Sequence, residues 1–404
     1  MNKPSSVRLG IVGAGGMGSV HARSVRDGKI PQLELTAIAD THPQRLEAFK
    51  GLATFTSADA LIASGKVDAV LIATPHYSHT TIGIAALNAG LHVLVEKPIS
   101  VHKEDCEKLI AAHRPDSGQI FAAMFNQRTD PRYRKVKQML TDGTLGKLQR
   151  LNWIITDWFR CESYYRSGGW RATWAGEGGG VLLNQCPHQL DLWQWLFGMP
   201  QRVTAHCQLG RFHEIEVEDS VTALLDYENG VQGVFVTTTG EAPGTNRLEI
   251  VGENGKIIVE EEHCIRFIRN EVSSATFSRA SAEGFAKPPV WNIEIPVEGR
   301  GPQHDGILAN FTQAILGQEE LIAPASEGIR SVELGNAMLL SSIRDQPVTV
   351  PLDAQAYAAE LKKRSSRPPF ERSPRDRTVK FWTLREASNA SLVYPPLCNS
   401  PNSP

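Results

Sequence analysis

The sequence predicts an α/β protein that combines an N-terminal doubly wound parallel sheet with a C-terminal α/β domain built on a large, mostly antiparallel open sheet. Two observations lead to this prediction. Over the first 125 residues, short apolar runs alternate with helical patterns, which is typical of βαβ units in a parallel sheet. After about residue 126, longer strand-like runs follow one another along the chain, which favours antiparallel pairing.

The parallel sheet is predicted from five apolar runs and the helical patterns between them. The runs cover residues 7–12, 33–39, 69–73, 92–95 and 120–124, and the helical patterns cover residues 18–27, 44–51, 57–64, 79–88 and 103–113. Because crossovers between parallel strands are right-handed, these units wind into one sheet with helices on its two faces. We assign residues 1–125 to this domain.

The second sheet is predicted from seven longer runs. They cover residues 148–158, 202–209, 220–227, 231–238, 247–251, 256–260 and 265–269, and helices are expected at 188–197 and 305–318. Two Glu-Asn-Gly segments, at 228–230 and 253–255, lie between such runs. Asn-Gly indicates a hairpin because both residues tolerate positive φ. We assign residues 126–366 to this domain and residues 367–404 to an extended tail rich in Pro, Arg and Ser.

Charge and composition exclude several classes of protein. The 404 residues include 42 Lys and Arg and 44 Asp and Glu, a formal net charge of −2, so the chain has no global field for capturing nucleic acid or an anionic membrane. No uncharged apolar run is long enough for a transmembrane helix, and without a secretory signal at the N-terminus we expect a cytoplasmic location. The six cysteines form no CxxC pair, so we expect neither a disulfide framework nor a metal site.

A glycine-rich turn joins the first predicted strand to the first predicted helix. It reads Gly13-Ala-Gly15-Gly-Met-Gly18, the G-x-G-x-x-G pattern of a dinucleotide-binding Rossmann domain. Gly13 allows the tight turn, Gly15 lets a pyrophosphate approach the backbone, and Gly18 lets helix and strand pack closely. The helix N-terminus then offers unpaired N–H groups to the phosphates. A glycine turn without a ligand, or a domain that has lost its cofactor, is the alternative interpretation.

Asp40 ends the second predicted strand. A carboxylate at this point can accept hydrogen bonds from both ribose hydroxyls of an adenosine. It would also repel a 2′-phosphate, so the sequence favours NAD over NADP, although Arg45 lies nearby and keeps NADP open.

Three further motifs accompany the glycine turn. Thr74-Pro75-His76-Tyr-Ser-His79 follows the run at 69–73, Glu96-Lys97-Pro98 follows the run at 92–95, and residues 178–198 contain Asn184, His188 and Asp191. Together, from about residue 7 to 360, they resemble the Gfo/Idh/MocA family, the relatives of glucose–fructose oxidoreductase and inositol dehydrogenase. The resemblance implies a nucleotide domain followed by a mostly antiparallel α/β domain, and NAD(P)-dependent oxidation or reduction of a sugar or polyol hydroxyl.

The resemblance assigns the chemistry to Lys97 and His188. Lys97 matches the family lysine that hydrogen-bonds the reacting hydroxyl, and the Lys97–Pro98 bond is expected to be cis; a lone lysine here would instead be a solvated strand-end residue. His188 would take the hydroxyl proton, for which imidazole is suited by its pKa near 6.5; otherwise it is a packed histidine. The family has an acid at the position of Asn184, which can hydrogen-bond a hydroxyl but cannot carry a proton away. Asp191 either orients the His188 ring or is a structural acid.

The cofactor and catalytic residues predicted in this way come from both domains. The catalytic residues are Lys97, His188 and Asn184; the cofactor-binding residues are Gly13, Gly15, Gly16, Met17, Gly18, Asp40, Arg45, Thr74, Pro75, His79, Glu96, Lys97 and Asn126. The resemblance places His79 near the cofactor ribose, Thr74 and Pro75 along the nicotinamide half, and Asn126 at the domain junction.

An aromatic segment precedes the Asn184 motif. Residues 157–174 contain three tryptophans, two tyrosines and three arginines. Aromatic faces stack on the C–H faces of pyranose rings and arginines bind hydroxyls, but such a cluster can also pack against the sheet or another subunit. The predicted substrate-binding residues are Lys97, Trp158, Arg160, Tyr165, Trp170, Arg171, Trp174, Asn184 and His188.

The amino-acid sequences of this segment and of the Asn184 motif are similar to those of the family branch that oxidises hexosides at C3. This branch includes glucoside 3-dehydrogenases and the oxidoreductases of C-glycoside deglycosylation. We therefore predict an NAD-dependent enzyme that converts a sugar or glycoside to a 3-keto-glycoside. The alternatives are a myo-inositol or nucleotide-sugar dehydrogenase, a glycosidase that uses NAD only transiently, and an NAD-sensing subunit without turnover. An open sheet with one uncovered face favours a homodimer or homotetramer, with a small-molecule sugar or glycoside as the binding partner.

Overall fold

A parallel sheet forms the centre of the N-terminal part of the chain. It is described here from a computed structural model that covers residues 5–260, 263–368 and 370. Within these residues the sheet has six strands, in the order β3-β2-β1-β4-β5-β6, all paired in parallel. The strands are β1 (Val7–Val12), β2 (Leu33–Ala39), β3 (Ala53–Phe55), β4 (Ala69–Ile72), β5 (His92–Val95) and β6 (Phe121–Ala123).

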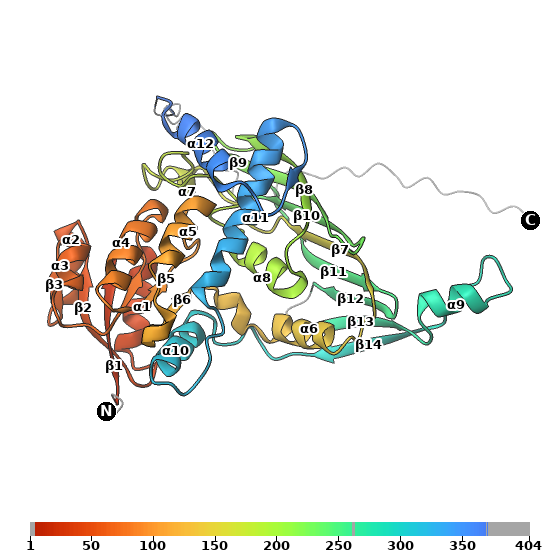
Figure 1. Ribbon diagram of the computed structural model, residues 1–404, viewed down its shortest axis with the longest axis horizontal. Coiled ribbons are helices and arrows are strands. Elements are labelled where there is room, and N and C mark those ends of the chain that lie inside the picture. The colour runs from red at the N-terminus through yellow and green to blue at the C-terminus, as the bar shows by residue number, and fades with distance from the viewer. Residues whose placement is uncertain (1–4, 261–262, 369, 371–404) are drawn as a thin grey trace, which may run out of the picture. The chain divides into compact units, whose positions relative to one another are not determined.

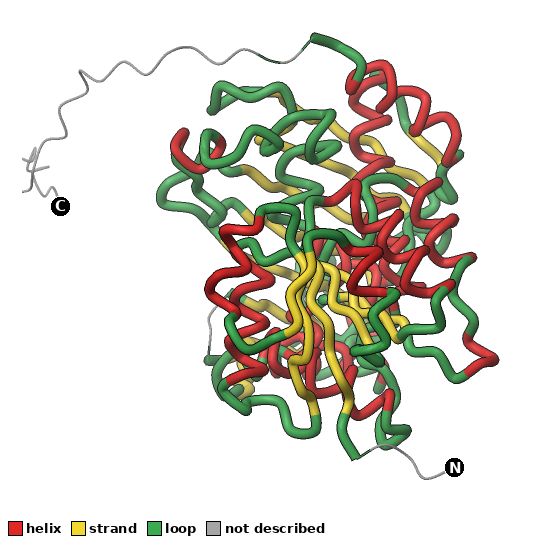
Figure 2. Tube along the Cα trace, turned by 90° about the vertical axis from the view of Figure 1, so that its left-hand side faces the viewer, coloured by secondary structure: helices red, strands yellow, loops and turns green. Residues whose placement is uncertain are grey.

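Helices flank this sheet on both sides (Figure 2). They are α1 (Gly16–Arg26), α2 (Pro43–Leu46), η1 (Glu47–Phe49), α3 (Ala58–Ile62), α4 (His76–Asn88), α5 (Lys103–Ala111) and η2 (Pro115–Ser117). With both faces covered, the central strands are apolar at almost every position, and β4 is buried throughout. The strand order reverses between β1 and β4, so a crevice opens at their carboxyl ends, where ligands bind in open α/β sheets.

A second, larger sheet is built mainly from antiparallel strands (Figure 1). Over the described ranges it contains nine strands, in the order β14-β13-β12-β11-β7-β10-β9-β8-β15. They are β7 (Leu148–Ile155), β8 (Arg202–Leu209), β9 (Glu218–Asp226), β10 (Gln232–Thr238), β11 (Asn246–Gly252), β12 (Gly255–Val259), β13 (Cys264–Asn270), β14 (Val290–Pro296) and β15 (Val348–Thr349). Only β7 and β10 pair in parallel, with Gly233 opposite Leu151. The predicted fold class is confirmed, and both Asn-Gly segments join antiparallel neighbours.

The remaining helices follow β6 along the chain, and several of them pack against the large sheet. They are η3 (Asn126–Thr129), α6 (Pro131–Thr141), α7 (Glu162–Tyr165), α8 (Pro187–Phe197), α9 (Ser274–Ala280), α10 (Gln303–Ile315), α11 (Ala325–Arg344) and α12 (Ala354–Ser365). Helix α11 contacts both α8 and β8, while α9 projects from the β13–β14 hairpin (Figure 1). Helix α8, which carries His188, is therefore packed against α11.

The chain returns to the N-terminal part after the large sheet. Ile307, Leu308 and Phe311 of α10 belong to the same buried cluster as the parallel strands. The Ala123 N–H donates to the Ala323 carbonyl at 3.0 Å, so a later segment extends the edge of β6. Residues 303–325 lie in the range that the sequence assigned to the second domain, but they complete the core of the first.

Several boundaries differ from those predicted. Helix α1 begins at Gly16 instead of residue 18, α4 begins at His76 instead of residue 79, and the strand predicted to reach residue 158 ends at Ile155. The sequence did not indicate β3, β14, β15, α6, α9, α11 or α12. Most of the predicted tail, residues 371–404, lies outside the described residues.

Candidate active site

The glycine turn lies at the crevice between β1 and β4. Gly13 has φ +101°, and a Cβ there would lie 2.5 Å from the Ala73 carbonyl oxygen. A Cβ on Gly18 would lie 1.8 Å from the Gly13 carbonyl oxygen, whereas Gly15 and Gly16 face open space. The glycines thus let β1, α1 and the loop after β4 approach closely, and they leave the N-terminus of α1 uncovered for an anion. Met17, in the first turn of α1, is exposed.

Asp40 follows β2 and binds back to the glycine turn. Its carboxylate accepts hydrogen bonds from the backbone N–H groups of Ala14 and His42, both at 2.8 Å. Arg45 Nη1, on the exposed side of α2, lies 3.3 Å from the same carboxylate. Burial opposes ionisation, but these donors outweigh it and lower the pKa of Asp40. Asp40 therefore stays ionised beside the turn, as a carboxylate that binds ribose hydroxyls must.

Three buried polar atoms around the crevice have no hydrogen-bond partner in the described part of the chain. They are Thr74 Oγ1 in the loop after β4, Asn126 Oδ1 in η3, and His188 Nδ1 in α8. Asn126 is oriented by its other amide atom, because its Nδ2 donates to Gln303 Oε1 at 2.8 Å. Buried polar groups without partners are costly and rare. Together with the open glycine turn, these residues would hold the phosphates and polar edges of a dinucleotide.

Lys97 links the two parts of the chain. It follows β5, its bond to Pro98 is cis as predicted, and its Nζ donates to the Asn184 carbonyl at 2.8 Å. Burial lowers the pKa of Lys97, while the charges of Glu96 and Glu177 oppose this change. An ammonium with one N–H on a fixed carbonyl keeps two N–H groups for a substrate oxygen.

Glu96 is paired with a histidine of helix α1. Its Oε1 lies 2.6 Å from His21 Nε2 of α1, with both side chains buried. Burial opposes ionisation, but the contact with His21 outweighs it and lowers the pKa of Glu96 to about 2. The His21 ring lies 5.6 Å from the His304 ring at the start of α10. Neither histidine was singled out from the sequence, because each is a lone His in a helical pattern.

His188 is the second residue of α8 and is buried. Burial, and next the positive charge of Lys97, lower the pKa of His188 well below 6.5. At neutral pH its imidazole is therefore uncharged. The charge of Lys97 contributes to this shift, and the shared catalytic role of the two residues stays a prediction.

Asn184 binds Lys97 through its main-chain carbonyl, and its side chain contacts an acid that the sequence did not reveal. Its Nδ2 donates to Glu177 Oε1, and Glu177 Oε2 accepts the Ala172 N–H at 2.6 Å. Glu177 is buried, and burial raises its pKa. The carboxylate that position 184 lacks is thus supplied by position 177, immediately before the three consecutive glycines at 178–180.

Asp191 is a structural acid. Its two oxygens accept from Arg128, at 2.8 Å from Nε and 2.6 Å from Nη2, and Oδ1 also accepts from Gln194. Arg128 Nη1 reaches Glu327 of α11 at 2.6 Å. The interpretation in which Asp191 orients the His188 ring is therefore replaced by a buried ion pair that joins η3 to α8.

His79 lies at the cofactor side but its ring is already occupied. Nδ1 lies 2.8 Å from the Pro98 carbonyl oxygen and Nε2 lies 2.8 Å from the Thr74 carbonyl oxygen. His79 thus ties the loop of Thr74 and Pro75 to the loop of Lys97. The predicted contact of His79 with the cofactor ribose stays a prediction, and these bonds favour an indirect role.

Part of the aromatic segment forms pairs of arginine and aromatic side chains, and one of these arginines, Arg171, lies 3.9 Å from Glu177. Arg171 Cζ lies 4.8 Å from the Trp170 ring and 4.7 Å from the Tyr164 ring, and Trp170 meets the His76 ring edge-on at 5.7 Å. Arg160 lies over Trp158 at 5.6 Å. Trp158, Arg160, Trp170 and Arg171 are all partly exposed, so they remain candidates for substrate contact.

Tyr165 and Trp174 lie elsewhere. Both belong to the hydrophobic core of the large sheet, where they are 4% and 2% exposed. The Tyr165 hydroxyl is paired with Thr239 Oγ1 at 2.7 Å. For these two residues the structure favours packing, the alternative that the sequence left open, over contact with a sugar.

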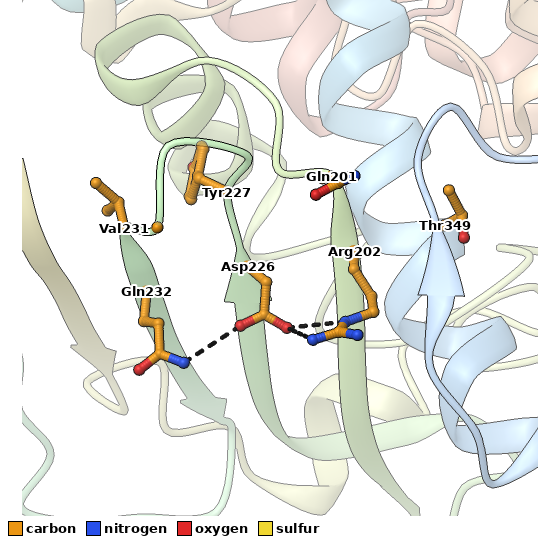
Figure 3. Close-up of a pocket in the computed structure, with 8 residues that line it drawn as sticks. Gln201, Arg202, Asp226, Tyr227, Val231, Gln232 and Thr349 are labelled. Carbon is orange, nitrogen blue, oxygen red and sulfur yellow. Dashed lines mark hydrogen bonds and ion pairs between the residues drawn. The ribbon is translucent and has the colours of Figure 1, made fainter.

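The hollow drawn in Figure 3 lies apart from these residues. It has a volume of about 370 Å³ and is lined by Gln201, Arg202, Asp226, Tyr227, Gly230, Val231, Gln232 and Thr349. In Figure 3, Asp226 lies between Arg202 and Gln232 and contacts both. None of the predicted site residues lines it. Among the described residues, no group of three or more His, Cys, Asp and Glu side chains is placed to hold a metal, and no helix has the length and apolarity to cross a bilayer.

The doubly wound sheet, the open glycine turn and the lysine–histidine pair define a two-domain, dinucleotide-dependent oxidoreductase. Residues 7–123 match an oxidoreductase family with an NAD-binding Rossmann fold, and residues 133–258 match the GFO/IDH/MocA C-terminal domain. The chain belongs to the Gfo/Idh/MocA family, and its N-terminal part is an NAD-binding Rossmann domain.

Relatives with assigned activities span most of the chain. Inositol 2-dehydrogenase of Rhizobium meliloti is 25% identical over 342 residues, which are 82% of this chain and 92% of that protein. The WlbA dehydrogenase from Bordetella pertussis, solved with NADH and UDP-GlcNAcA, has a TM-score of 0.71 and 26% identity, covering 86% of this chain and all of its own. Levoglucosan dehydrogenase with NADH and levoglucosan has a TM-score of 0.71 at 20% identity, over 86% of this chain and 100% of that one; this likeness concerns the fold.

Proposed function

We propose that this protein uses NAD⁺ to oxidise a secondary hydroxyl of a sugar or glycoside, at C3 of a hexoside, and that the product is a 3-keto-glycoside. The observation that carries the proposal is the Lys97 side chain, which follows β5 of the NAD-binding sheet and donates to the Asn184 carbonyl, just before the helix that carries His188. Alcohol oxidation needs these two groups, one to accept the hydroxyl proton and one to stabilise the oxygen as it gains charge.

The residues that would hold NAD are the Gly13–Gly18 turn, Asp40, Thr74 and Asn126, whose open backbone and unpaired atoms fit its phosphates and polar edges. When bound, NAD⁺ supplies the two-electron oxidant for the carbinol carbon. His188 accepts the hydroxyl proton, because its lowered pKa keeps it neutral. Lys97 donates a hydrogen bond to the same oxygen and favours its deprotonation. The partly exposed aromatic residues exclude water from one side of the ring that is oxidised.

A sugar-type substrate is supported by the relatives, since the inositol, levoglucosan and UDP-GlcNAcA proteins all handle polyhydroxylated rings. The choice of a hexoside rests on the partly exposed pairs Trp158–Arg160 and Trp170–Arg171, which offer an aromatic face and hydrogen-bond donors to a pyranose ring. Oxidation of myo-inositol is the second candidate, because the Rhizobium meliloti relative aligns over 92% of its length.

The experiment is a panel of methyl glucosides, free glucose, myo-inositol and UDP-sugars, each incubated with the protein and NAD⁺ while NADH absorbance is followed. The expected result is NADH formation with a methyl glucoside, and a ketone at C3 in the NMR spectrum of the product. NADH formation with myo-inositol alone would select the second candidate. No NADH with any of these compounds would overturn the assignment of a sugar substrate.

A further inference from the structure

The pair formed by Glu177 and Asn184 determines which atom Asn184 presents. Glu177 is buried and its two oxygens have different partners: Oε2 accepts the Ala172 N–H at 2.6 Å, and Oε1 accepts from Asn184 Nδ2 and lies 3.9 Å from Arg171 Nη1. Because Asn184 donates its Nδ2 to Glu177, the amide nitrogen faces this carboxyl group. The amide oxygen then points away from Glu177.

Asn184 is only partly buried, and its Oδ1 has no hydrogen-bond partner among residues 5–260, 263–368 and 370. The neighbouring donor is Lys97, whose Nζ binds the main-chain carbonyl of Asn184 at 2.8 Å and not its side chain. The site therefore offers an ammonium donor from Lys97 and, beside it, an amide oxygen that can only accept.

We propose that Glu177 is a positioning residue that holds the Asn184 amide with its oxygen toward the substrate, and that this makes the enzyme select a hydroxyl on a carbon next to the one oxidised. The inference rests on the proposed function. A vicinal hydroxyl can donate a hydrogen bond to Asn184 Oδ1. A fluorine, a keto oxygen or a carboxylate can only accept, so none of them can form a hydrogen bond with the amide oxygen.

Substitution of Glu177 by glutamine would reverse the amide. The buried Ala172 N–H still needs an acceptor, so the oxygen of the introduced glutamine takes the place of Oε2 and its NH₂ group faces Asn184. Two NH₂ groups cannot pair, and Asn184 turns its oxygen toward the introduced glutamine and its NH₂ toward the substrate. In the double variant Glu177→Gln/Asn184→Asp, the aspartate accepts from that glutamine and again presents an oxygen to the substrate.

The kinetic test uses methyl β-glucoside and NAD⁺. For Glu177→Gln we expect KM to rise about tenfold, the effect of one mispaired hydrogen bond, with a smaller change in kcat. The double variant should regain most of the loss, and the preference of wild type for the glucoside over its 2-deoxy-2-fluoro and 4-deoxy-4-fluoro analogues should weaken in Glu177→Gln. A purely structural Glu177 predicts a silent Glu177→Gln, because the glutamine still accepts the Ala172 N–H.

The matched control is Glu216→Gln. Glu216 Oε1 accepts the Trp174 N–H at 2.6 Å, so it anchors the same segment by the same kind of bond without contacting Asn184. Its KM should equal that of wild type. An unchanged KM in Glu177→Gln, or a double variant no better than Glu177→Gln, would overturn the proposal.

Thermal unfolding provides a readout that does not depend on activity. Asn184→Asp alone places two carboxylates side by side in a buried site, which is unfavourable, and should lower the midpoint at pH 8 by about 2–4 °C. The double variant should restore this midpoint. NADH affinity should be the same in wild type, Glu177→Gln, Asn184→Asp and the double variant. If wild type oxidises no sugar or polyol, the proposed function fails, and equal midpoints for Asn184→Asp and the double variant would separately refute the pairing.

Discussion

The buried ion pair between Arg128 and Asp191 makes a quantitative prediction about the junction of η3 and α8. Both side chains are 1% exposed, and two bonds of 2.8 and 2.6 Å join them. Asp191→Ala leaves two buried N–H groups of a guanidinium without that carboxylate. Only Glu327 and the Ile322 carbonyl remain as hydrogen-bond partners of the Arg128 guanidinium within the described residues. Breaking a buried pair from one side typically costs about 3–5 kcal/mol, and we expect a loss of that size in the free energy of unfolding.

The measurement is urea-induced unfolding of wild type and Asp191→Ala, followed by tryptophan fluorescence. The control is Asp226→Ala, which removes an ion pair of similar length, 2.8 Å, whose Arg202 is 57% exposed. Exposed pairs contribute only about 0–1 kcal/mol. The double variant Arg128→Met/Asp191→Leu, with no buried charge left at that pair, should recover much of the loss.

Two results would refute this reasoning. One is a loss in Asp191→Ala no larger than that in Asp226→Ala. The other is a folded Asp191→Ala protein that binds NADH normally but has lost its chemical step, because Asp191 would then act on His188 and not on Arg128.

Three further predictions concern Lys97, the glycine turn, and Glu218, whose carboxyl group accepts the Gly180 and Leu182 N–H groups in the loop before α8. Lys97→Met should lower kcat at least about 100-fold in the NADH absorbance assay while NADH affinity, measured by fluorescence, changes little. Gly18→Ala should weaken NAD⁺ binding at least about tenfold in calorimetry, because its Cβ would lie 1.8 Å from the Gly13 carbonyl oxygen; full affinity would contradict the packing role. Burial raises the pKa of Glu218 to about 7, above its unfolded value of about 4.3. The folded state therefore keeps this proton over that interval, and stability falls as pH rises from about 4.3 to 7. Glu218→Gln should lose this part of the pH dependence, on the order of 3 kcal/mol, in urea unfolding at pH 5 and 8; an unchanged slope would contradict it.

The fold was predictable where local pattern and burial agree. The strands of the parallel sheet are apolar on both faces, and the Asn-Gly segments specify their hairpins, so those elements emerged from the sequence. Helix α11 did not, because it is buried along most of its length and polar residues such as Glu333 and Asn336 lie among its buried positions, which obscures the expected separation of polar and apolar faces. Helix α6 carried a signal that was overlooked, namely Asp130 directly before Pro131. The Asp130 side chain accepts the Arg132 N–H at 2.9 Å and caps the helix.

The site was predictable where a motif places residues on strand ends, as with the glycine turn and Lys97. Glu177 was not, since its contact with Asn184 crosses a series of turns that has no regular period. His304 was missed for another reason. It approaches His21 only because α10 returns to the first domain, and no local pattern in the sequence reports such a long-range contact. The roles assigned to Lys97, His188 and Asn184 stay predictions.

The return of residues 303–325 to the parallel sheet has a consequence for biosynthesis. The nucleotide-binding part cannot close its apolar surface when residue 125 leaves the ribosome, because Ile307, Leu308 and Phe311 have not yet been made. At roughly 5–20 residues per second, the remaining 200 or so residues take on the order of 10–40 s. During that interval the nascent sheet exposes apolar surface to which chaperones can bind. A gene fragment that encodes only the first 125 residues would leave that surface exposed permanently.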